Sequence, residues 1–239
     1  NFIPQKINMR LFLGYFLFFF ALPVFSQEKA NTENAPKVKI DSLYREDQFY
    51  FGITYNTLRD TPEGFSKGKI ATGFSGGFLR DMPLNTRRNV AIASGVGLAY
   101  NNYNQNIAVS GSSEVPVYTV MTTDYSKNKF SQLLVEVPLE FRWRTSTYEA
   151  HKFWRIYGGL KCSYLVYDKS VFNSGTSNTV ITGNKDFNKL TYGAYISSGY
   201  NTLNVYAYYG LNPIFKSAKT STENLVMKSF NFGIIFYIL

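Results

Sequence analysis

Six charged residues alternate with apolar residues along two neighbouring stretches of the sequence. They are Glu136, Glu140, Arg142, Arg144, Arg155 and Lys161. Carboxylates can pair with guanidinium and ammonium groups that share one face of a protein interior where water is scarce. The group would form either a gate or narrow ion path, or a set of structural ion pairs that fills a small interior. The second interpretation is favoured if the interior is narrow, because side chains then fill it.

The remaining reactive residues of the sequence form no catalytic or metal-binding pattern. The only histidine is His151, and its possible partners are sequence neighbours such as Lys152. Acid–base or nucleophilic catalysis needs a positioned second group, and zinc needs several ligands at a recognisable spacing. The single cysteine, Cys162, has no histidine nearby in sequence and is expected to be a small apolar strand residue. The sequence therefore predicts no enzyme activity, no metal and no cofactor.

A second candidate for binding is the polar stretch 103–129. It contains Tyr103, Tyr118 and Tyr125 among Ser, Thr and Asn residues. Such a composition offers stacking and hydrogen bonding to a ligand or partner. The three tyrosines are candidate external loop contacts, and a mobile solvated loop that shields the interior is the alternative.

The elements that must position these residues are β-strands. Aromatic residues make up 18% of the chain and charged residues 17%, which favours strands over a helical bundle. Eight segments alternate with a period of two. They are 47–56, 68–81, 88–102, 130–145, 152–168, 186–200, 202–213 and 226–239. We therefore predict an all-β fold: a single eight-stranded antiparallel transmembrane up-and-down β-barrel over residues 47–239.

Alternation alone does not say which face of a barrel points outward. A soluble, lipocalin-like ligand binder would place the apolar face inside. Three features favour a barrel with lipid outside: the length of the segments, the aromatic residues near their ends and the small residues on one face of 88–102.

Connections between the segments alternate in length as well. Long ones are predicted at 57–67, 103–129, 169–185 and 214–225, and short ones at 82–87, 146–151 and Asn201–Thr202.

The N-terminal part of the chain predicts export. Met9 to Ser26 contains a basic residue, a short apolar run and a small residue at its end, which is typical of a signal peptide cleaved after Ser26. Residues 27–46 are predicted to be a flexible periplasmic segment.

The net charge is +9, but the basic residues form no cluster typical of nucleic-acid binding. Outer-membrane lipid and lipopolysaccharide are the expected partners, with other envelope or secretion proteins as further candidates.

Three motifs carry a family resemblance. Residues 76–84 (GGFLRDMPL), 95–98 (GVGL) and 134–140 (LVEVPLE) resemble the outer-membrane β-barrel family often labelled PorT-like. The resemblance covers about residues 47–239 and implies a porin-like barrel in the outer membrane. It implies a structural or interaction role, with a small channel or an accessory role in type IX secretion and gliding as alternatives.

Overall fold

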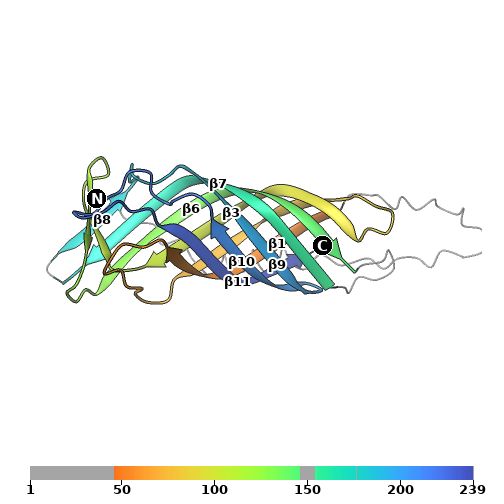
Figure 1. The fold of residues 1–239 in the computed structure, drawn as a ribbon, viewed down its shortest axis with the longest axis horizontal. Helices are drawn as coiled ribbons and strands as arrows, with labels where there is room; N and C mark the ends of the chain where they lie inside the picture. The colour runs from red at the N-terminus through yellow and green to blue at the C-terminus, as the bar shows by residue number, and fades with distance from the viewer. Residues whose placement is uncertain (1–45, 146–153, 176, 239) are drawn as a thin grey trace, which may run out of the picture. The chain divides into compact units, whose positions relative to one another are not determined.

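A computed structural model describes residues 46–145, 154–175 and 177–238 of the chain (Figure 1). Eight long strands form its main sheet. They are β1 (Glu46–Arg59), β2 (Thr72–Pro83), β3 (Val90–Asn104), β6 (Lys127–Arg144), β7 (Trp154–Asn173), β9 (Leu190–Tyr200), β10 (Leu203–Gly210) and β11 (Lys228–Ile238). The eight segments predicted from alternation correspond to these strands in order.

The sheet closes on itself. Each long strand pairs antiparallel with the next one along the chain, and β1 pairs with β11 from Phe49 opposite Ile238 to Arg59 opposite Lys228. Closure leaves no open edge in the ring, so backbone donors and acceptors are satisfied between neighbouring strands. The predicted eight-stranded antiparallel up-and-down barrel is confirmed.

In the middle of the barrel, most outward side chains are apolar and the charged side chains point into the lumen. On β6, Val137, Leu139 and Phe141 are each more than half exposed, while Glu140 and Arg142 are buried. A soluble barrel would show the opposite arrangement, because its apolar side chains must be removed from water. The lipocalin-like alternative is therefore wrong. Within the residues described, no helix has the length and apolar character needed to cross a membrane.

The connections at the two ends of the barrel differ in length. Residues 84–89 and 201–202 form short turns at one end, and Asn201 adopts a left-handed conformation with φ of 55°. The predicted turn 146–151, which includes His151, lies outside the described residues. The opposite end carries the long connections, with the hairpin of β4 (Ile107–Gly111) and β5 (Pro116–Val120) and the short strand β8 (Asn178–Thr182) (Figure 1).

The strand β7 reaches further into the loop end than alternation predicted. The strand β7 continues to Asn173, where its last residues pair with β8. Its pairing with β6 shifts between Leu133 and Leu134, and Val166 and Tyr167 both face outward. A bulge of this kind inserts one unpaired residue and reverses the alternation beyond it. The predicted loops 103–129 and 169–185 are therefore too long, because strand pairing persists inside them.

Two buried clusters fill the barrel. A cluster rich in tyrosine occupies the lumen and consists of Tyr50, Leu79, Tyr157, Tyr195, Tyr206, Tyr208, Ile235 and Tyr237. An apolar cluster, called the apolar cap below, combines the loop-side ends of the barrel strands with the long connections. It includes Tyr103, Tyr118, Phe130, Phe187, Ile214, Phe215, Leu225 and Met227. Side chains therefore fill the interior both in the lumen and at the loop-side end of the barrel.

Candidate functional site

Arg142 lies at the centre of the charged interior. Its side chain is fully buried, with Nη1 2.9 Å from Asp81 Oδ1 and Nε 2.7 Å from Glu140 Oε2. The other oxygen of Asp81 accepts from Arg144 Nη2 at 2.8 Å. Asp81 on β2 therefore holds two arginines of β6 from across β3. We call these four residues, Asp81, Glu140, Arg142 and Arg144, the central ion-pair network.

A second ion pair lies further along the lumen. The ammonium nitrogen of Lys161 on β7 is 2.9 Å from Glu136 Oε2 on β6, and both side chains are buried. Lys161 also donates to the hydroxyl of Tyr206 at 3.0 Å. Its nitrogen lies over the rings of Tyr195 and Tyr208 at 5.2 and 5.7 Å from their centroids. This cation is therefore enclosed by one carboxylate and by aromatic rings.

Tyrosines connect the central network to the opposite wall. The hydroxyl of Tyr195 donates to Glu140 Oε1 at 2.8 Å, and that of Tyr237 donates to the same oxygen at 3.3 Å. The guanidinium of Arg142 lies 4.6 Å from the ring centroid of Tyr157. Acceptors, donors and rings from β6, β7, β9 and β11 thus meet across the lumen. Such fully buried charges are tolerated only with this degree of pairing.

The structure brings together the six charged residues that the sequence singled out. All six are buried, with Arg155 lying 6.0 Å from the ring centroid of Tyr237. Sequence reasoning did not include Asp81, which ends one predicted segment far from its partners in the chain. It also did not include the inward tyrosines, although their alternation with apolar residues carried the same signal as the charged residues. The arrangement supplies fixed, mutually neutralised charge.

The three candidate contact tyrosines do not form one external surface. Tyr103 belongs to β3 and stacks on Phe130, with ring centroids 4.9 Å apart. Tyr118 is buried in the hairpin, where its hydroxyl exchanges hydrogen bonds with the side chain of Asn184 and burial raises its pKa. The predicted contact surface is therefore wrong for these two residues, because both contribute to the apolar cap. Only Tyr125 is partly exposed.

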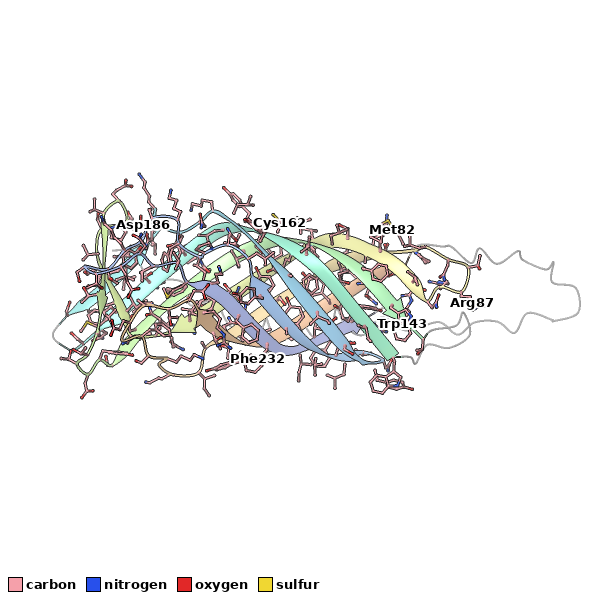
Figure 2. All side chains as sticks on the ribbon, viewed as in Figure 1. Met82, Arg87, Trp143, Cys162, Asp186 and Phe232 are labelled. Atoms are coloured by element: carbon pink, nitrogen blue, oxygen red, sulfur yellow. The ribbon has the colours of Figure 1, made fainter. Side chains whose placement is uncertain are left out.

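Several other residues lie outside the lumen. Cys162 lies on the outer face of β7 in the middle of the barrel, whereas Asp186 lies among the long connections and Trp143 and Arg87 lie near the short ones (Figure 2). Among the residues whose positions are described, no group of three or more His, Cys, Asp and Glu side chains could hold a metal ion. The lumen offers charge and hydrogen bonding without a recognisable catalytic arrangement.

Comparison with known proteins gives one family match. The model of the family described as outer membrane protein beta-barrel domain matches residues 25–216 of the chain. No curated protein matches the sequence.

Solved structures of two surface proteins are among those similar to this one. Ail, the attachment invasion locus protein of Yersinia pestis, is 14% identical with a TM-score of 0.37, covering 80% of this chain and 97% of Ail. Ail is also known in complex with the heparin analogue sucrose octasulfate. Neisserial surface protein A is 12% identical with a TM-score of 0.35, covering 82% of this chain and 98% of the neisserial protein.

Proposed function

Because this chain belongs to the outer membrane protein β-barrel domain family, we propose that it is a closed, non-conducting barrel with a structural or interaction role in the cell envelope. The observation that carries the proposal is the central ion-pair network. Arg142 has no exposed surface while it pairs with both Asp81 and Glu140. An ion path needs a lumen that water can enter, and this is not compatible with a cation buried in this way.

The apolar cap adds a second barrier above the charged layer. The rings of Phe187 and Phe215 stack with centroids 4.6 Å apart, and Phe130 packs against both. A dry aromatic layer opposes the passage of ions, because hydrated charge is costly to place there. The cap also gives the long connections a rigid base. We therefore favour a surface that presents a fixed shape to a partner over a pore with mobile lids.

The platform for such a partner is the β4–β5 hairpin with the connections around it. Val115 and Val117 are exposed at its tip by 70% and 51%. A groove of about 670 Å³ runs beside the hairpin and is bordered by residues 116–120 and 219–222. Isolated exposed valines are common on protein surfaces, but here Val117 lines a groove on a rigid support. This combination supports an interaction role.

Conductance measurements test the proposal. The purified full-length chain is inserted into planar lipid bilayers and compared with Arg142→Gln, with Arg80→Gln as the matched control because Arg80 lies outside the lumen in an exposed pair with Asp47. We expect no discrete current steps from the unaltered protein. Regular steps that change in Arg142→Gln and not in Arg80→Gln would establish the alternative, a small porin-like channel.

The interaction role is tested by affinity purification from envelope membranes. We expect a stable complex that is weakened by Val117→Asp and unaffected by a substitution on the lipid-facing side of the barrel. If cross-linking recovers the chain alone, only the structural role remains.

Three expectations from the sequence stay predictions: the absence of enzyme activity, a PorT-like role in type IX secretion, and removal of a signal peptide after Ser26. Sequencing the N-terminus of the mature protein checks the last of these.

A further inference from the structure

The outer face of the barrel changes from apolar to cationic along β6. The outward side chains of β6 are all apolar from Trp143 to Leu133. The next positions on the same face are Ser131, Lys129 and Lys127. Lys127 is exposed and Lys129 is partly exposed. The change therefore occurs on the side of the long connections, where the apolar band ends.

The neighbouring strands show the same change in register. Leu133 lies between Tyr100 of β3 and Tyr167 of β7, in the last row that is apolar on all three strands. Ser131 then lies opposite Lys169 of β7, and Lys129 occupies the next outward position on β6. Lys169 and Lys129 are thus diagonal neighbours, whose side chains are within reach of one ligand group on a sheet surface.

A groove on this face collects further basic and hydrogen-bonding groups. Its volume is about 650 Å³, and its lining includes Lys69, Lys127, Lys129, Tyr125 and Asn104. Asp124 also contributes to the lining. Among the described side chains, no carboxylate lies within ion-pair distance of Lys69, Lys127, Lys129 or Lys169, in contrast to Lys228, which pairs with Asp60. The three lysines of the groove outnumber its one carboxylate, Asp124, so the groove carries a net positive charge.

The position of the lysines along the strands indicates which part of the membrane they face. Each outward step of two residues advances roughly 7 Å along a strand, so Lys129 lies roughly 13 Å beyond Leu133 along β6. Lysine side chains extend away from an apolar surface toward the membrane–water boundary. A bilayer that covers the apolar band would therefore place the ammonium groups at the level of its lipid headgroups.

We propose that Lys69, Lys127, Lys129 and Lys169 form a binding site for the phosphate groups of a phosphorylated glycolipid, lipid A, in the outer leaflet. The phosphates contact the lysines, and the acyl chains lie along Tyr100, Leu133 and Tyr167. Lysine binds phosphate as a compact point charge, so the three lysines of the groove and the neighbouring Lys169 can together hold a bisphosphorylated headgroup. The site goes beyond the proposed function and does not depend on whether the lumen is closed.

Native mass spectrometry of the full-length barrel in a neutral detergent tests the site with purified bisphosphorylated lipid A. The test variant is Lys127→Gln/Lys129→Gln/Lys169→Gln. The control is Lys189→Gln/Lys216→Gln/Lys219→Gln, which removes the same charge from exposed loop positions. We expect the test variant to lose at least about tenfold in affinity and the control to change little, because each lysine near an anionic headgroup contributes separately.

Three outcomes would overturn the proposal. Equal weakening in both triple variants would mean that lipid A responds only to overall charge. Unchanged binding in the test variant would place the lipid elsewhere. Binding of inorganic phosphate as tight as that of lipid A would identify an anion site that does not require a lipid. Heat-modified gel mobility confirms that each variant remains folded, so that loss of binding is distinguished from loss of the barrel.

Discussion

The hydroxyl group of Tyr50 occupies the space that a side chain at Gly97 would need. An ideal Cβ built on Gly97 would lie 2.0 Å from Tyr50 Oη. The ring of Tyr50 also covers Gly77, where a Cβ would lie 2.8 Å from the ring. The three residues lie in one row of adjacent strands, so Tyr50 on β1 requires glycine at this row of β2 and β3.

The first prediction concerns this contact. Gly97→Ala is expected to destabilise the barrel by about 1–3 kcal/mol, because overpacking displaces a buried ring. The free energy of unfolding in denaturant, measured on the folded barrel in detergent, reports the change. Gly158→Ala is the control, since the nearest atom to its Cβ would be 3.9 Å away.

A second variant, Tyr50→Phe, tests the contact between the Tyr50 hydroxyl group and Gly97. Among the described residues, Tyr50 Oη is buried without a hydrogen-bond partner, so its removal alone should cost little. The double variant Tyr50→Phe/Gly97→Ala is expected to recover part of the stability that Gly97→Ala loses. Strictly additive effects would contradict the contact.

The second prediction concerns Asp81. Asp81→Asn leaves Arg142 and Arg144 without their shared carboxylate and is expected to cost about 3–5 kcal/mol, as the breaking of a buried pair does. The midpoint of guanidinium-induced unfolding measures it. Asp47→Asn is the matched control on the neighbouring strand β1, because its pair with Arg80 is exposed and should contribute little. Similar shifts in both variants would contradict a special role for Asp81.

The third prediction concerns the pair of Glu136 and Lys161. Lys161→Met leaves a buried carboxylate without its ammonium partner, and Glu136→Gln leaves a buried ammonium without its carboxylate. Each single variant is expected to lose about 3–5 kcal/mol, and the double variant less than the sum. A double-mutant cycle of unfolding free energies measures the coupling. A coupling near zero would show that the surrounding tyrosines satisfy each group alone.

The fourth prediction separates the apolar cap from the barrel. Phe215→Ala removes a buried ring that stacks on Phe187 and is expected to loosen the long connections, with a cost of about 3–5 kcal/mol to the packing of the cap. Limited proteolysis should cleave the connections faster while heat-modified gel mobility stays unchanged. Val180→Ala is the control at an exposed position of β8. Loss of mobility shift in Phe215→Ala would mean that cap and barrel fold as one unit.

Much of the barrel was predictable because alternation in a closed sheet has a direct physical cause. Each strand has one face in lipid and one in the lumen, so Phe141 and Arg142 differ in both chemistry and burial. The bulge at Val166 and Tyr167 was not predictable, since two successive outward residues look like an ordinary break in the pattern. The hairpin within 103–129 was also not predicted, because each of its strands has only 5 residues and lies between polar residues.

The candidate site was predictable only in part. Charges on one strand face, such as Glu140 and Arg142, indicated a lumen network, but the pairing partner Asp81 depends on the order of strands around the ring. The burial of Tyr103 and Tyr118 depends on how the long connections fold over the barrel mouth. That arrangement is a tertiary property with no periodic signal in the sequence.

The pairing of β1 with β11 has a consequence for how fast the molecule assembles. Phe49 meets Ile238, so the contact that completes the ring joins residues almost as far apart along the chain as the barrel allows. Closing so long a loop has a large entropic cost, and proteins dominated by distant contacts fold slowly. Until β11 arrives, β1 keeps an unpaired edge that can associate with other chains. Assembly of this barrel therefore has a late committing step, and a factor that holds β1 until β11 docks would accelerate it.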